Sequence, residues 1–169
     1  MIMRVLAIDP GYGRCGMAVV EKNGTSTALG VNGNKEILLY SACVETSAKA
    51  DFAMRLAMVV SECSSLLSKY KPDCVAIEKL YVTKNQKTAM RVAEVRGALI
   101  NCATNYGVEV FEYTPGEVKS AAGGWGGADK KQMATMLHAL MRIEKEIKYD
   151  DEYDAIAIGI THLAHSRSS

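Results

Sequence analysis

Short apolar runs, each bounded by polar residues or turn signals, recur along the 169-residue chain. Continuous runs of this kind are typical of strands buried on both faces, as in a parallel or mixed sheet under helices. The first three runs follow one another without an intervening helical pattern, which predicts an antiparallel meander. The runs lie at residues 3–9, 15–21, 36–43, 73–78 and 108–113.

Helical periodicity separates or follows the later runs. Apolar residues recur with a period of 3.6 across residues 52–67, and a Met- and Leu-rich stripe crosses residues 133–141. Residues 86–105 and 152–164 predict two more helices. The predicted order of elements is βββαβαβα, which gives one α/β domain over residues 1–169, with a five-stranded mixed sheet and helices on both faces.

The stretch 86–105 is apolar around nearly its whole circumference. A helix of this kind needs burial on two sides, and one sheet supplies only one of them. Either neighbouring helices cover it, or its outer face forms the interface of a two-fold dimer. The pattern alone leaves both alternatives open.

Composition narrows the class of protein. An apolar content of 49% is ample for one packed core, and no apolar stretch is long enough to span a membrane. The five cysteines never occur as Cys-x-x-Cys, so we expect buried thiols in a reducing, cytoplasmic compartment and neither a zinc site nor disulfides. A net charge of only +1 means that a claim of nucleic-acid binding must depend on local charge.

Four carboxylates stand at positions where chemistry is expected. Asp9 and Glu78 each end an apolar strand, and ligand sites gather outside the carboxyl ends of strands. Asp151 and Asp154 are three residues apart on the last helix and so share one face. Each acid alone is explained by a surface charge or by a helix N-terminus, which favours acids. Together the four predict an acidic cup.

An acidic cup of oxygen ligands suits Mg²⁺, for which Mn²⁺ can substitute. Crowded carboxylates repel one another unless a cation neutralises them. Two cations per site, about 3.5–4 Å apart, can activate a water and stabilise the leaving oxygen of a phosphodiester. We expect Asp150 and Glu152 to be solvated neighbours and not ligands.

A basic stretch follows Glu78 and is a candidate phosphate track beside such a site. Exposed basic residues are more often ordinary solvated surface. Tyr81 and Trp125 could stack on unpaired bases, although each more often packs against its own domain. The candidate track consists of Lys79, Lys84, Lys87, Arg91 and Arg96, extended by Lys119, Lys130 and Lys131.

The segment Gly11-Tyr-Gly-Arg-Cys-Gly16 matches the dinucleotide-binding pattern G-x-G-x-x-G. That pattern needs a helix to begin there, whereas this chain continues into the apolar run of a strand. We interpret the glycines as allowing a tight hairpin beside Asp9. An actin-like ATP-binding fold, which carries such a hairpin, needs two subdomains, and the chain is barely long enough for one.

Several of these motifs, in this order, resemble the RuvC family of Holliday junction resolvases within the ribonuclease H-like superfamily. The resemblance covers residues 3–164, and it depends on the whole set because each motif alone is weak. The chain departs from the family in a longer 24–36 segment and a glycine-rich 123–127 loop. The matching motifs are Ala7-Ile-Asp-Pro-Gly11, Ala76-Ile-Glu78, Lys84-Asn85, Ala93-Glu-Val-Arg-Gly97 and Asp151-x-x-Asp154-Ala-Ile-Ala.

The resemblance implies a homodimeric, Mg²⁺-dependent endonuclease that nicks two opposed strands of a four-way DNA junction and leaves 5′-phosphate and 3′-hydroxyl ends. It implies that Asp9, Glu78, Asp151 and Asp154 are the catalytic metal ligands. It also implies DNA contacts for Tyr81, Lys119 and Lys130, and it favours the dimer interpretation of helix 86–105. Together with the candidate track, the expected nucleic-acid-binding residues are Tyr81, Lys84, Lys87, Arg91, Lys119 and Lys130.

Three questions stay open at this point. A branch-migration complex is a possible partner. An RNA-directed nuclease of the same superfamily is the nearest alternative function. A non-catalytic module that binds branched nucleic acid is another, although it would not need all four acids.

Overall fold

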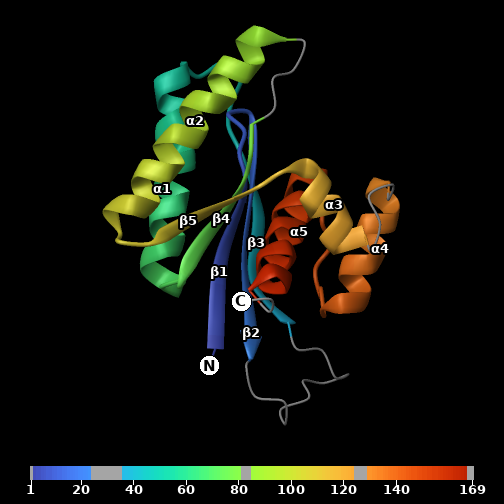
Figure 1. Cartoon of the computed structure of the whole chain (residues 1–169). Helices are drawn as coiled ribbons and strands as arrows, with labels where there is room; N and C mark the ends of the chain where they lie inside the picture. The colour runs from blue at the N-terminus through green and yellow to red at the C-terminus, as the bar shows by residue number, and fades with distance from the viewer. Residues whose placement is uncertain (1, 24–35, 81–84, 124–128, 167–169) are drawn as a thin grey trace.

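The computed structural model describes residues 2–23, 36–80, 85–123 and 129–166. Its centre is a five-stranded sheet of order β3-β2-β1-β4-β5. Figure 1 shows this sheet nearly edge-on, with helices on both sides, as the sequence predicts. The strands are β1 (Ile2–Asp9), β2 (Arg14–Asn23), β3 (Glu36–Glu45), β4 (Cys74–Glu78) and β5 (Glu109–Tyr113).

The first three strands form the predicted antiparallel meander, and the two later strands make the sheet mixed. β1 pairs antiparallel with β2, which in turn pairs antiparallel with β3. β4 lies parallel to β1 on its other side, and β5 lies parallel to β4. The segment 10–13 is the turn between β1 and β2, so the glycine pattern marks a hairpin and not a dinucleotide site.

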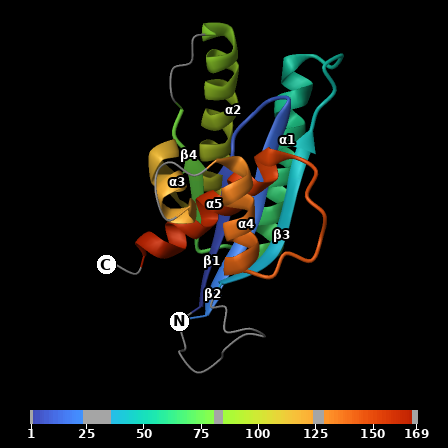
Figure 2. The same cartoon turned by 90° about the vertical axis from the view of Figure 1, so that its right-hand side faces the viewer.

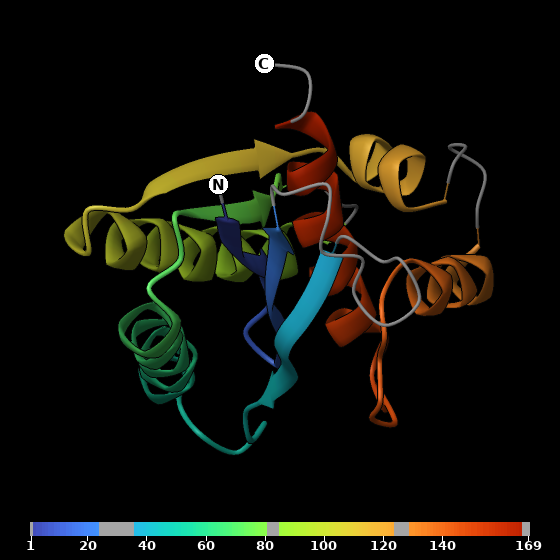
Figure 3. The same ribbon diagram turned by 90° about the horizontal axis from the view of Figure 1, so that it is seen from below.

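The helices that follow β3 and β4 pack against one face of the sheet, and the last helix packs against the other, with the two helices before it packed on that last helix (Figure 3). Alternate residues of β1 divide between the two cores: Leu6 and Ile8 face α1 and α2, whereas Val5 and Ala7 face α5. The helices are α1 (Phe52–Tyr70), α2 (Gln86–Asn105), α3 (Pro115–Gly123), α4 (Lys130–Leu140) and α5 (Asp150–His165).

The order βββαβαβα is correct as far as β5, but three helices follow β5 where that order has one. The Met- and Leu-rich stripe forms α4, whereas nothing in the sequence analysis predicts α3. A capping box starts α3: the Glu117 amide donates to Thr114 Oγ1 at 3.1 Å, and Glu117 Oε2 accepts from the Thr114 amide at 2.7 Å. With Pro115 at the first helical position, this Thr-Pro-x-Glu sequence was a readable start signal.

Helix α5 crosses the middle of the sheet, where small residues let it come close (Figure 2). A Cβ atom on Gly16 of β2 would lie 1.8 Å from the carbonyl oxygen of Asp151. A Cβ atom on Gly159 would lie 2.6 Å from a methyl group of Val20 and 3.2 Å from Ala7 Cβ. Glycine at these two positions therefore fixes the depth at which α5 packs.

The cysteines and helix α2 contribute to the core largely as the sequence predicts. All five cysteines are free, and four of them are buried. Helix α2 buries Val95 and Leu99, while its other side leaves Met90 67% exposed. In the described ranges 2–23, 36–80, 85–123 and 129–166, no helix is long and apolar enough to cross a membrane.

Candidate active site

The pairing of β1 with β4 brings two of the predicted acids together. These strands run parallel with Ile8 opposite Ile77, so the residues that end them, Asp9 and Glu78, lie at the same edge of the sheet. The backbone around Glu78 is fixed from two sides. Arg96 Nε donates to the Glu78 carbonyl at 3.1 Å, and the Lys79 amide donates to the Tyr113 carbonyl at 2.8 Å.

The first turns of α5 bring the other two acids to this edge. Asp151 sits directly over Gly16, the residue of β2 that pairs with Asp9. Asp154 follows three residues later on the same helix face. Both side chains are partly exposed. The four acids predicted from the sequence therefore meet at one end of the sheet.

Electrostatic coupling among these acids is strong. Burial raises the pKa of Asp9 well above its usual value, and the negative charges of Glu78, Asp154 and Asp151 raise it further. Burial and then Asp154 raise the pKa of Glu78. For Asp154, burial raises the pKa, while Lys130 lowers it. An ionised Asp9 is thus costly here without additional positive charge.

The carboxylates are neighbours but do not form a finished coordination sphere. Among the residues that the structure describes, no group of three or more His, Cys, Asp or Glu side chains is close enough to hold a metal ion. The donor set itself, a half-buried Asp9 with three further carboxylates around it, fits a hard cation such as Mg²⁺. Binding would require the four side chains to turn toward a common point.

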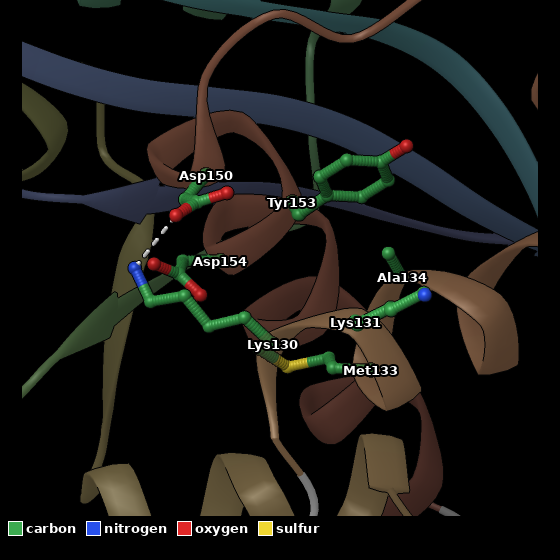
Figure 4. Close-up of a pocket in the computed structure, with 7 residues that line it drawn as sticks. All are labelled: Lys130, Lys131, Met133, Ala134, Asp150, Tyr153 and Asp154. Carbon is green, nitrogen blue, oxygen red and sulfur yellow. Dashed lines mark hydrogen bonds and ion pairs between the residues drawn. The ribbon is translucent and has the colours of Figure 1, made fainter.

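Positive charge comes from α3 and α4. Lys119 lowers the pKa values of Glu78 and Asp154, and Lys130 lowers those of Asp9 and Asp154. Lys130 Nζ lies 3.0 Å from Asp150 Oδ2, and this ion pair is drawn in Figure 4. Two of the lysines that the resemblance assigns to DNA contacts therefore border the carboxylates.

Two pockets include site acids in their walls. The first, of about 250 Å³, lies between α4 and α5 and has Asp154, Lys130 and Tyr153 in its lining (Figure 4). The second, of about 270 Å³, contains Glu78 and Thr88 together with an apolar wall. Both pockets therefore leave open space beside a site acid.

The other residues predicted to contact nucleic acid are connected less clearly to the four acids. Lys87 is exposed on the first turn of α2. The guanidinium of Arg91 lies 4.0 Å from the centroid of the Phe52 ring, and its Nη1 lies 3.0 Å from Glu94 Oε2, so this residue already has two partners. Tyr81 and Lys84, and also Trp125, lie outside the described residues.

The expectation that Glu152 is a solvated neighbour is wrong. Glu152 is buried, accepts a hydrogen bond from Ser41 Oγ at 2.6 Å and pairs with Lys145 Nζ at 2.6 Å. One step along a helix turns a side chain by about 100°, so Glu152 points to β3 while its neighbours point to the site. Asp150 is exposed, as expected.

The sequence analysis missed Arg14. Its Nε lies 3.4 Å from Asp151 Oδ2, and it comes from the start of β2, whereas Lys119 and Lys130 come from α3 and α4. The available signal was its position within the glycine hairpin that follows Asp9. A hairpin that brings backbone close to a site also brings its charged residues there.

Comparison with known proteins places the chain in a family. The model of the family "Crossover junction endodeoxyribonuclease RuvC" matches residues 5–162. The crossover junction endodeoxyribonuclease RuvC of Brevibacillus brevis is 40% identical over 160 residues, which cover 95% of this chain and 91% of the relative.

Two solved structures are similar in fold. RuvC of Thermus thermophilus in complex with a Holliday junction substrate superposes with a TM-score of 0.86 at 30% identity, covering 98% of this chain and 96% of the other. The yeast mitochondrial Holliday junction resolvase has a TM-score of 0.70 at 16% identity, covering 98% and 82%, which supports the fold alone. With its ribonuclease H-like sheet and near full-length match, the chain belongs to the RuvC family of crossover junction endodeoxyribonucleases.

Proposed function

We propose that this chain resolves four-way DNA junctions by cutting two opposed strands symmetrically, at the site formed by Asp9, Glu78, Asp151 and Asp154. The observation that carries the proposal is the meeting of these four acids at one sheet edge in a RuvC-family fold. The Thermus thermophilus relative, whose structure contains a Holliday junction substrate, supports the choice of substrate.

The family implies a metal-dependent nuclease, and the four acids are the proposed ligands of two Mg²⁺ ions. When bound, such ions activate a water and stabilise the leaving oxygen of a phosphodiester. Burial and the three neighbouring carboxylates raise the pKa of Asp9 well above its usual value, so this acid would gain most from a nearby cation. Rotation of the four side chains toward a common point is part of the proposal. The products are 5′-phosphate and 3′-hydroxyl ends.

Basic residues around the acids are proposed to hold the strand that is cut. Lys119 and Lys130 lie on α3 and α4 beside Asp154 and reach its charge. Lys87 on α2 stands near the opposite, Glu78-containing pocket, whose wall includes Thr88 and Ala89. Arg91 would have to leave Glu94 to reach a phosphate. Tyr81 and Lys84 complete the proposed set from the connection between β4 and α2.

Two such sites are proposed to act together in a homodimer formed through the outer face of α2. Met90 on α2 is 67% exposed, and Met54 and Met58 on α1 are 59% and 46% exposed. Large exposed apolar side chains on adjacent helices are typical of a surface that a partner covers. Two-fold symmetry of the protein then matches the pairing of the two cuts. A branch-migration complex as partner and a cytoplasmic location stay predictions.

One experiment tests substrate and mechanism together. The protein is offered a labelled four-way junction, linear duplex, single strand, and RNA–DNA hybrid side by side in Mg²⁺ or EDTA. Paired symmetric nicks in the junction alone, dependent on Mg²⁺, are expected. Cleavage of the hybrid in preference to the junction would favour the RNA-directed alternative. Junction binding without any cleavage would favour a non-catalytic module.

A further inference from the structure

Arg14 stands beside the site acids but is only loosely engaged. It begins β2, and its Nε lies 3.4 Å from Asp151 Oδ2. Charge-assisted hydrogen bonds are usually shorter, about 2.7–2.9 Å. The Arg14 side chain is 52% exposed and that of Asp151 26% exposed, so water screens the pair. This ion pair is therefore weak and can be exchanged for another at little cost.

An aromatic ring holds Arg14 at this position without neutralising it. The guanidinium carbon lies 5.0 Å from the centroid of the Tyr149 ring, and Lys148 Nζ lies 4.6 Å from the same centroid. Tyr149 is the residue that precedes α5, immediately before the acidic turn. Stacking on a ring orients a guanidinium while leaving its charge available. Positive charge thus gathers on the Asp151 side of the acids as well as on the side of Lys130.

We propose that Arg14 is a nucleic-acid-binding residue whose guanidinium leaves Asp151 for a phosphate of the bound strand once a divalent cation occupies that carboxylate. The inference depends on the proposed function, because it takes Asp151 as a metal ligand and a DNA strand as the substrate.

Simple electrostatics gives the direction of this exchange. A cation held by Asp151 takes over the negative charge that attracts Arg14 and repels the guanidinium. A phosphate oxygen that shared this cation with Asp151 would bring its phosphate within reach of a side chain already 3.4 Å from Asp151 Oδ2. The planar guanidinium fork matches two phosphate oxygens, which a lysine ammonium cannot do in the same geometry.

Salt dependence of junction binding tests the proposal. Anisotropy of a labelled four-way junction is measured over a series of NaCl concentrations, once in EDTA and once in Ca²⁺, a hard cation that oxygen ligands bind. Gels run after each titration establish that the bound junction is intact. The variants are Arg14→Gln and Arg14→Lys. The control is Arg142→Gln, because Arg142 is also exposed and paired, with Glu144 at 2.5 Å, but lies on the pocket lined by β3.

In Ca²⁺, the slope of log affinity against log salt is expected to be shallower by about 0.9 in Arg14→Gln than in the wild type, which is the loss of one phosphate contact. Affinity is expected to fall roughly tenfold. In EDTA, the two slopes should agree. Arg14→Lys should keep the slope and regain only part of the affinity, and Arg142→Gln should match the wild type.

Three results would overturn the inference. Equal slopes for wild type and Arg14→Gln in Ca²⁺ would mean that Arg14 contacts no phosphate. An equal loss of affinity in EDTA and in Ca²⁺ would mean that the contact does not depend on the cation. Calorimetry gives the third, since removing a competing charge should leave Ca²⁺ binding to the free protein no weaker, and up to about fivefold tighter. Weaker binding in Arg14→Gln would contradict the exchange.

The same data separate this inference from the proposed function. If the wild-type protein does not bind the junction at all, both fail. If the wild type binds the junction with Ca²⁺ dependence and only the difference between slopes is missing, the proposed function stands and the role of Arg14 does not.

Discussion

Two neighbouring regions of this molecule differ in how their carboxylates are stabilised. Glu152 is buried against β3, where Ser41 Oγ donates to it at 2.6 Å and Lys145 Nζ pairs with it at 2.6 Å. Asp9 lies at the end of β1, where burial and then three further carboxylates raise its pKa. The chain therefore supplies Glu152 with a hydrogen-bond donor and a positive charge. Ionised Asp9 instead requires additional positive charge, such as a bound cation.

The difference separates structural acids from functional ones on a single helix. Asp151, Glu152 and Asp154 lie within one turn of α5, yet among the described residues only Glu152 of these three has a short ion pair with a lysine. Buried charge without a partner costs folding free energy, so its retention at one edge of the sheet needs a functional reason.

The largest effect is expected for Asp9→Asn. This near-isosteric change removes the charge at the centre of the acidic edge, and loss of metal-supported catalysis is worth several kcal/mol of barrier. We expect junction cleavage in Mg²⁺ to fall by at least about 10³-fold, while junction binding stays close to wild type. The measurement is single-turnover cleavage of a labelled junction.

The stability of Asp9→Asn provides the control. A carboxylate with a raised folded-state pKa lowers stability above that pKa, so without divalent cations the variant should be at least as stable as wild type at pH 7. This advantage should disappear below about pH 4, where the unfolded carboxyl is protonated too. A variant that cleaves at the wild-type rate would exclude Asp9 as a metal ligand.

The second-largest effect is expected at the contact between α5 and β2, which brings Asp151 and Asp154 to the other two acids. Gly16→Ala puts a Cβ atom 1.8 Å from the Asp151 carbonyl oxygen, so the start of α5 must move. We expect a loss of about 3 kcal/mol of unfolding free energy, measured by urea denaturation, together with reduced cleavage.

Gly116→Ala is the matched control for this change. Its Cβ atom would meet only Thr114 Oγ1, at an ordinary 3.9 Å. Replacing a helical glycine by alanine there should leave stability unchanged or raise it by about 0.5–1 kcal/mol. Equal effects of the two substitutions would show that close packing at Gly16 does not set the position of α5.

Removing Glu152 should lower the free energy of unfolding more than it lowers cleavage. Glu152→Ala leaves Lys145 and Ser41 without their shared acceptor, and we expect a loss of about 2 kcal/mol of unfolding free energy. Cleavage per folded molecule should stay within a few fold of wild type. Glu144→Ala, which removes a 68% exposed partner of Arg142, should change stability by less than about 1 kcal/mol. A large loss of cleavage in folded Glu152→Ala would place Glu152 in the site after all.

The smallest effect concerns pH and a residue of α5 about two turns beyond Asp154. His162 is buried between Tyr113, whose hydroxyl is 2.8 Å from Nδ1, and Cys74, whose Sγ is 3.2 Å from Nε2. Burial lowers the pKa of His162 below its ordinary 6.5, with a smaller contribution from His165. The unfolded chain then binds the proton first, so this residue's contribution to stability is present above pH 6.5 and is lost as the pH falls below it.

The unfolding free energies of the wild type and of His162→Gln are measured by denaturation between pH 5 and 8. The difference between the two proteins gives the pH-dependent contribution of His162. His162 should add at most about 1.4 kcal/mol per pH unit to the slope of unfolding free energy against pH. The variant should lack this contribution. Taking the difference matters because the raised pKa values of Asp9, Glu78 and Asp154 act in the opposite direction. Identical pH profiles would show that His162 titrates as it does in the unfolded chain.

Much of the architecture could be read from the chain. The apolar runs gave the five strands, and the hairpin interpretation of the Gly11–Gly16 segment was correct because a strand follows it. Helix α3 could also have been found, since Thr114, Pro115 and Glu117 form a start signal. It was missed because a short helix carries too little apolar periodicity to be noticed without its cap.

The sequence by itself determined which acids end strands and which share a helix face, because strand ends and helical spacing are local properties. Only the tertiary structure decided that Glu152 is neutralised by Lys145, that Arg14 reaches Asp151, and that Gly16 lets α5 approach β2. The contacts of Arg14 and Gly16 with Asp151 join residues that are distant in the chain, and Lys145 meets Glu152 from the segment that precedes α5. Their existence depends on the depth and angle at which α5 packs, which steric fit across the sheet sets and local pattern does not.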